Sequence, residues 1–251
     1  MCVSGRQSWW ARICLICAVM LLASCAVAPN GERNPDPLEA VNRVTYTFNK
    51  GVDRYLLRPV ASGYAKVMPR PIRRGVSNFF SNLAEPTVIV NGLLQAKFTQ
   101  AASDVGRFSL NTTIGLLGFF DVASDLGLTK HDESFGTTFG RWGMGHGTYL
   151  VLPFFGPSSI RDGVGTLGDT AFYLPTYIKR DSVRWGLTAT WAVDKRQKLL
   201  PFDEALKIAP DEYLFVRDAY LQSRYMTVYG EPAPLEEPDL EGIDFDDLED
   251  F

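Results

Sequence analysis

The stretch from His131 to Ser134 holds the residue types of a nucleophilic catalytic site: a histidine, two carboxylates and a hydroxyl. Catalytic triads are assembled across a fold, so neighbours in the sequence seldom form one. The chain contains neither a G-x-S-x-G nucleophile elbow nor an H-E-x-x-H zinc motif, and its second histidine, His146, lies between two glycines. We therefore expect no enzyme, no metal site and no cofactor.

A second reactive residue ends the stretch Leu22-Ala23-Ser24-Cys25. An apolar run from Ile13 to Leu22 precedes it, and Arg6 and Arg12 lie upstream. A positive region, a short apolar core and small residues before a cleavage point are typical of a secretory signal. The core is too short to span a bilayer, which takes ~20 residues. Cysteine directly after Leu-Ala-Ser resembles a bacterial lipobox, so residues 1–24 are expected to be a lipoprotein signal peptide.

Cys25 would then be the acylated first residue of the mature chain, with an ordinary signal peptide and a chance cysteine as the alternative. The other cysteines, Cys2, Cys14 and Cys17, all lie in the signal, so no disulfide is expected. Lipid chains anchor firmly because each buried methylene contributes ~0.8 kcal/mol. Ala26, in place of aspartate, resembles the sorting signal of Gram-negative outer-membrane lipoproteins. The expected location is the periplasmic leaflet of the outer membrane.

Charge is distributed unevenly along the chain. The tail from Glu231 to Phe251 has ten acidic residues and no basic one, which leaves a body of net charge +4 (23 basic against 19 acidic residues) between Ala26 and Gly230. So acidic a tail is expected to be disordered. Residues 25–35 read as a lipidated tether. A mildly basic body is compatible with an anionic membrane, although a net charge of this size is weak evidence by itself. Nothing indicates a nucleic-acid partner.

The spacing of apolar residues predicts an all-α fold for residues 36–230. Asp36, Pro37 and Glu39 form a capping-box pattern, and Arg58-Pro59 predicts the end of the first helix. Glu85-Pro86 is expected to start a new helix. The stretch from Thr148 to Pro157 is expected to be a short apolar loop, although it also resembles a buried strand, and Ser158 or Ser159 would cap the next helix. The other predicted helices cover residues 72–83, 98–113, 182–199 and 210–228.

Glycine alternates with large apolar residues from Ile114 to Gly147, a composition unsuited to a soluble loop. We interpret this segment as lying against lipid or lining an apolar passage; the alternative is a long buried connection. Gly136 to Gly147 would form a hinge, because glycine reaches backbone angles that other residues avoid. The candidate channel or hinge residues are Leu116, Leu117, Phe119, Phe120, Gly140, Trp142, Gly143, Gly145 and Gly147.

Arginines supply candidate contacts for lipid headgroups. Arg184 shares a predicted helix face with Leu187 and Trp191, where a cation could extend along the apolar surface to phosphate. Arg70, Arg73 and Arg74 gather at a helix start, which the helix dipole does not favour for cations. Solvated surface arginines are the alternative in both places.

Motifs spread over the body resemble the MlaA (VacJ) family of outer-membrane lipoproteins, from about Asp36 to Gly230. The first group is Asp-Pro-Leu-Glu-Ala-Val-Asn-Arg from Asp36, Arg58-Pro59-Val60 and Gly75-Val76-Ser77-Asn78-Phe79. The second is Arg107-Phe108, Leu110-Asn111-Thr112, Phe135-Gly136, Leu152-Pro153-Phe154, Arg161-Asp162 and Val216-Arg217. The acidic tail lies outside the resemblance.

The resemblance implies a compact, ring-like helical domain embedded in the inner leaflet of the outer membrane. Such proteins are expected to remove phospholipid from the outer leaflet through an amphipathic channel and so to maintain lipid asymmetry. A porin trimer is the implied neighbour, and a periplasmic lipid carrier of an ABC transport system is the implied recipient. The alternative function is a structural lipoprotein that tethers or modulates a porin.

Overall fold

The fold of this computed structural model is mainly helical, and the structure describes residues 36–233. The expectations for the signal, Cys25, the tether and most of the acidic tail fall outside the described residues. The elements are α2 (Glu39–Val52), η1 (Asp53–Leu57), α3 (Arg58–Val67), α4 (Arg70–Leu94), α5 (Phe98–Thr113), α6 (Val122–Asp125), α7 (Phe135–Arg141), β1 (Tyr149–Leu152), β2 (Gly156–Ser159), α8 (Ile160–Phe172), η2 (Leu174–Tyr177), α9 (Asp181–Leu199), η3 (Leu200–Phe202), α10 (Asp203–Ile208) and α11 (Glu212–Tyr229).

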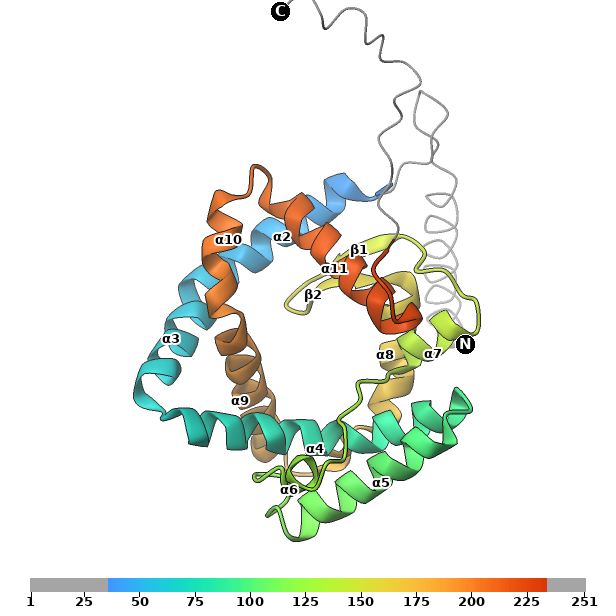
Figure 1. Cartoon of the computed structure of the whole chain (residues 1–251). Coiled ribbons are helices and arrows are strands. Elements are labelled where there is room, and N and C mark those ends of the chain that lie inside the picture. The colour runs from blue at the N-terminus through green and yellow to red at the C-terminus, as the bar shows by residue number, and fades with distance from the viewer. Residues whose placement is uncertain (1–35, 234–251) are drawn as a thin grey trace, which may run out of the picture.

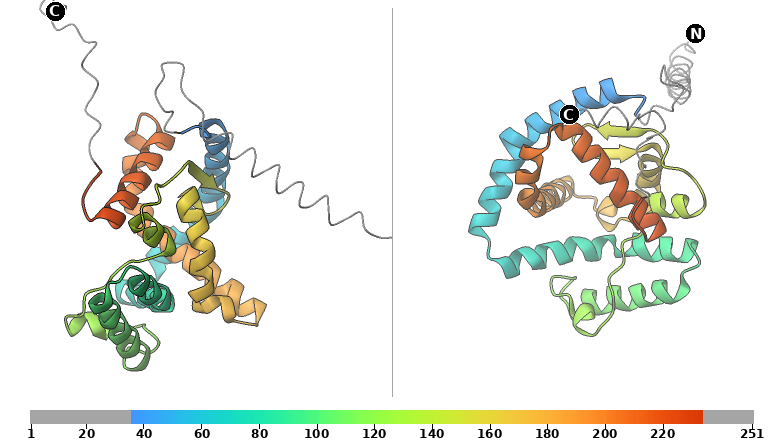
Figure 2. Two further views of the ribbon diagram at one scale, coloured as in Figure 1. Left: turned by 90° about the vertical axis from the view of Figure 1, so that its right-hand side faces the viewer. Right: turned by 45° about the horizontal axis from the view of Figure 1, so that its top comes forward.

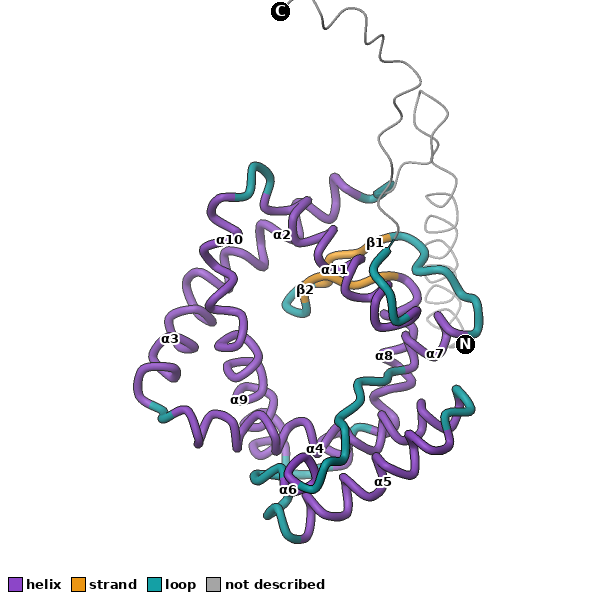
Figure 3. Tube along the Cα trace, in the orientation of Figure 1, coloured by secondary structure: helices purple, strands orange, loops and turns teal. Residues whose placement is uncertain are grey.

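The helices follow one another around a circuit (Figure 1). Helices α2 and α3 form one side, α4 crosses the bottom, and α7, α8 and α11 return on the other side to the β-hairpin and α2. Helix α9 packs on α3 and α4, and Figure 2 shows α5 and α6 alongside α4, outside the circuit. The loop from α6 to α7 runs across α4 (Figure 3). Segments distant in sequence are thereby brought onto α4.

The helical path from Glu39 to Val67 is continuous, so the predicted end at Arg58-Pro59 is wrong. Pro59 lies in the first turn of α3, directly after the π-helical turn η1, where Arg58 N–H donates to the Asp53 carbonyl. In this π-helical turn the N–H bonds to the carbonyl five residues earlier instead of four. The turn lies directly before Pro59, which has no N–H to donate. The predicted cap also differs: Leu38 is the N-cap, and the Asp36 carboxylate accepts from Asn42 Nδ2 at 3.0 Å.

Helix α4 runs through Pro86, so the prediction of a new helix there is wrong. Extensive packing against α5 offsets the lost backbone hydrogen bond. The bounds predicted for α5 are confirmed. Phe98 and Val105 are exposed, whereas Asp104 and Arg107 are buried. The helical periodicity located the helix but not the side that faces the protein.

The segment from Tyr149 to Ser159 is an antiparallel hairpin, which corrects the prediction of an apolar loop. Two asparagines of the first helix bind the edge of β1. Asn42 donates to the Tyr149 carbonyl at 3.0 Å and accepts from Val151 N–H at 2.9 Å, and Asn49 donates to the Leu152 carbonyl at 2.9 Å. These amides satisfy backbone groups that an edge strand leaves open. The Ser159 side chain, one of the two serines predicted as a cap, caps α8, and the Asp211 side chain caps α11.

In the described residues, buried polar side chains outnumber buried apolar ones, while large apolar side chains are common on the surface. Buried examples are Asn91, Asp104 and Arg161. The α2–α3 side exposes Val41, Val44, Phe48, Tyr55, Leu56, Val60 and Val67. Most water-soluble domains bury mainly apolar side chains and rarely expose so many large ones. Between residues 36 and 233, no helix is both long and apolar enough to cross a membrane.

Candidate functional site: a glycine segment held by a buried ionic network

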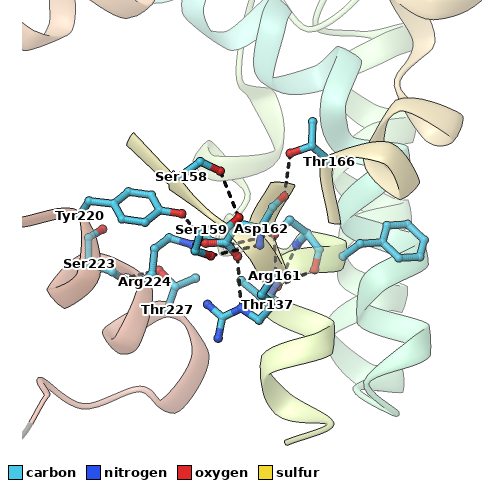
Figure 4. Close-up of polar contacts among 12 residues, drawn as sticks. Thr137, Ser158, Ser159, Arg161, Asp162, Thr166, Tyr220, Ser223, Arg224 and Thr227 are labelled. Carbon is cyan, nitrogen blue, oxygen red and sulfur yellow. Dashed lines mark hydrogen bonds and ion pairs between the residues drawn. The ribbon is translucent and has the colours of Figure 1, made fainter. Parts of the chain in front are cut away.

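A partly buried ionic network joins α7, α8 and α11 (Figure 4). The Asp162 carboxylate accepts from Arg224 Nε and Nη2, both at 3.0 Å, and from the Tyr220 hydroxyl. Burial by itself would raise the pKa of Asp162, but the hydrogen bonds from Arg224 and Tyr220 outweigh it and hold that pKa below its ordinary value. Asp162 is therefore ionised at neutral pH and fixes α8 to α11.

Two glycines of α7 let this network pack closely. A Cβ at Gly136 would lie 2.3 Å from Asp162 Oδ1, and one at Gly140 would lie 2.8 Å from Val228 Cγ2 and 2.9 Å from Arg161 Nη1. Both glycines are buried within a helix. The hinge predicted for Gly136 to Gly147 therefore cannot bend freely at Gly136 or Gly140. These two glycines instead allow the helices to pack closely.

The segment that follows, Trp142 to Gly147, is exposed throughout. Gly143 has φ +94° and Gly147 has φ +67°, angles that favour glycine. A Cβ at Gly143 or Gly145 would meet no described atom within 4 Å. Both ends are fixed, because Gly143 N–H donates to the Gly140 carbonyl at 3.0 Å and Arg161 N–H donates to the His146 carbonyl at 3.3 Å. Of the predicted hinge, Gly143 and Gly145 are the glycines at which an added Cβ would meet open space.

The apolar residues predicted beside it lie elsewhere, in the turn after α5. Phe119 packs on α4 so closely that a Cβ at Gly75 would be 2.3 Å from its ring, whereas Leu116, Leu117 and Phe120 are exposed. Leu116 and Leu117 both have positive φ, held by hydrogen bonds such as Gly118 N–H to the Asn111 carbonyl at 2.7 Å. The turn thus presents apolar side chains outward. The structure does not bring this turn together with the segment from Trp142 to Gly147.

Of the arginines predicted to contact lipid headgroups, Arg184 has an ion-pair partner. Arg184 Nη2 lies 2.7 Å from Asp181 Oδ1 on the same helix, and both side chains are exposed to solvent by more than a third. In the other predicted cluster, Arg70 and Arg74 are exposed and Arg73 is half-buried.

The residues that first suggested catalysis hold structural positions. His131 Nδ1 lies 2.7 Å from Asp104 Oδ1 on α5, and Ser134 Oγ accepts the Thr137 N–H as the cap of α7. Glu133 is buried and accepts from Gln95 and Lys97. The loop is thereby fixed across α4.

The Asp162–Arg224 pair was not assigned a role from the sequence, although Arg161-Asp162 stood among the family-like motifs. The same holds for Arg107, which donates to Asp121 at 3.1 Å and to the Ser124 hydroxyl at 3.1 Å from a buried position. A charged residue on an apolar helix face was the signal that could have identified these residues. A charge that is buried with such a face requires a partner.

A circuit of helices that exposes many large apolar side chains defines the class as a mainly helical protein with an apolar surface. The chain belongs to the MlaA lipoprotein family, whose family profile matches residues 34–227. It is 37% identical over 239 residues to the "Intermembrane phospholipid transport system lipoprotein MlaA" of Escherichia coli (strain K12), covering 92% of this chain and 94% of that one. The protein of the same name from Haemophilus influenzae is 38% identical over 197 residues, covering 76% and 78%.

A solved structure supports the same assignment. It matches with a TM-score of 0.70 and 36% identity, covering 78% of this chain and all of that chain. Its description reads "Structural basis for maintenance of bacterial outer membrane lipid asymmetry".

Proposed function

We propose that this protein removes phospholipid from the outer leaflet of the outer membrane and passes it toward the inner membrane. The family, and the names of relatives that take part in intermembrane phospholipid transport, support this function. The observation that carries it is that the described body buries many polar side chains and exposes many large apolar ones. A surface of this kind is stable against hydrocarbon, which does not compete for hydrogen bonds.

In this proposal the circuit of helices is a ring embedded in one leaflet, with Cys25 as its lipid anchor. Headgroups follow a polar path inside the ring and acyl chains follow apolar surface. The exposed side chains of Leu116, Leu117 and Phe120 contact hydrocarbon on the outside, which replaces the earlier assignment of them to the channel. Trp142 to Gly147 changes conformation to open or close the path, and Arg184 is the candidate headgroup contact. A porin trimer and a periplasmic carrier are the proposed neighbours.

Co-purified lipid tests this function against the alternative of a porin tether. The full-length, lipidated protein is extracted in mild detergent, and its phospholipid is quantified by mass spectrometry after extensive washing. We expect roughly one retained phospholipid for each protein molecule. A matched lipoprotein without this domain is the control. Phospholipid at the control's level would contradict transport and favour a tether.

The anchor has its own prediction. Cys25→Ser should abolish metabolic palmitate labelling and outer-membrane sorting, because serine offers no thiol for acylation. Membrane fractionation and labelling measure both effects, with Cys17→Ser as the control inside the signal. Full labelling of the Cys25 variant would show that the lipobox assignment is wrong.

A further inference from the structure

A pocket of about 260 Å³ lies between α4 and the loop that crosses it. Its lining comes from α4 on one side and from the loop on the other: Ser81, Ala84, Glu85, Val88, Lys130, His131 and Asp132. The loop is fixed at both sides of the pocket, through His131 on Asp104 and through Glu133 on Lys97. This volume is many times the space that one water molecule needs, and it suits a small polar group.

Glu85 contributes a carboxylate to this pocket without receiving a hydrogen bond there. The residue is 4% exposed, and among residues 36–233 its buried Oε1 atom has no hydrogen-bond donor. The nearest cation is Arg107, whose Nε lies 3.7 Å from Glu85 Oε1, while that guanidinium already donates to Asp121 and Ser124. A buried carboxyl that lacks a donor is costly to the fold. A ligand that brings a donor would remove this cost.

The charges around Glu85 favour a cationic donor. Asp104 and Asp121 add negative charge to its surroundings, and Arg107 and Lys130 offset part of it. Lys130 and Asp132 are exposed at the rim, where Lys130 can reach an anionic group outside the pocket. An ammonium inside and a phosphate near the rim would satisfy both charges. A primary ammonium has three N–H donors for Glu85 and Ser81, whereas a quaternary ammonium has none.

We propose that this pocket binds the primary ammonium of an ethanolamine phosphate group. The phospholipid headgroup is one source of such a group, and the free small molecule is the other. The first source rests on the proposed function and would make the protein selective for ethanolamine lipids. The pocket lies at the α4–loop crossing, apart from the glycine segment.

Calorimetry on the full-length, lipidated protein in detergent tests the site with phosphoethanolamine and phosphocholine as probes. We expect phosphoethanolamine to bind at least tenfold more tightly, because phosphocholine cannot donate to Glu85. Glu85→Gln, which removes the charge, and Ser81→Leu, which fills the pocket, should each abolish this difference. Asp125→Asn, at an exposed carboxylate of α6, should retain it. A circular dichroism melt of each variant establishes that it is folded.

The lipid that co-purifies from cells provides the second readout. A lower share of ethanolamine lipid in Glu85→Gln, at unchanged total phospholipid, identifies the headgroup as the source. An unchanged share together with Glu85-dependent binding of phosphoethanolamine identifies the free molecule. Failure of both Glu85-dependent effects overturns the proposal. Absence of any co-purified phospholipid would instead contradict the proposed function. The calorimetric result would then decide by itself whether the pocket binds phosphoethanolamine.

Discussion

At the scale of the residue, the buried carboxyl of Glu85 predicts how stability depends on pH. Burial raises the pKa of Glu85 to about 7 from an ordinary value of 4.5. The neutral form of Glu85 therefore persists to a higher pH in the folded protein than in the unfolded chain, and the stability that it contributes is complete below pH 4.5. That contribution is lost as the pH rises through about 7, up to roughly 3 kcal/mol in the free energy of unfolding.

Glu85→Gln removes this titration. Relative to the native protein, the variant should melt at a similar temperature at pH 4.5 and at a higher temperature at pH 8. Thermal melts in detergent followed by circular dichroism measure both differences. A difference that is the same at both pH values would contradict the assignment of Glu85 as a buried group of raised pKa.

The ionic pair of Asp162 and Arg224 predicts the opposite dependence. Asp162 has a lowered pKa, so its contribution is present at neutral pH and is lost as the pH falls through the folded value. Asp162→Asn leaves the partly buried Arg224 without its charge partner, which should cost about 3 kcal/mol at pH 7. Asp218→Asn, at an exposed carboxylate of α11, should change the melting temperature little. Equal melting temperatures for the two variants at pH 7 would show that the network does not hold the junction.

At the scale of the element, periodicity and caps predicted most of the helices. The bounds of α5, the start of α9 to within one residue and the caps at Ser159 and Asp211 follow from local signals that act within a few residues. The continuity of α4 through Pro86 depends on contacts with distant elements. Asn42 and Asn49 likewise support the hairpin from more than a hundred residues away. Such partners could not be identified from the local sequence.

The glycine segment carries the prediction for this scale. Gly143→Ala with Gly145→Ala should restrict the exposed span while destabilising the fold by about 1 kcal/mol, since Gly143 has positive φ and both positions are open. Outer-leaflet phospholipid in cells, measured through acylation of lipid A, should change several-fold. Gly140→Ala is the packing control and should lower the melting temperature instead, because its Cβ would overlap Val228. A stable double variant with native lipid asymmetry would rule out the hinge.

At the scale of the whole molecule, buried polar and exposed apolar side chains explain why periodicity located helices without showing what each apolar face contacts. Patterns of apolar residues indicate which side of a helix leaves water, and they do not distinguish a protein interior from lipid. Phe98 and Val105 on α5, and Val41 and Val44 on α2, all face outward. The interior is instead specified by polar pairs such as Asn42 with the hairpin. Whether an apolar helix face contacts protein or lipid depends on how the whole fold is assembled.

Site-directed spin labelling tests most directly whether lipid covers this exterior. The mature chain is expected to hold no free thiol once Cys25 is acylated, so single cysteines can be placed at Val44 and Leu117, which are 72% and 60% exposed. Glu204, on α10, is the exposed polar control. In bilayers, labels at Val44 and Leu117 should be relaxed by oxygen and shielded from a water-soluble nickel chelate, whereas the label at Glu204 should be reached by the chelate. Equal access of the chelate to all three labels would contradict a body embedded in lipid.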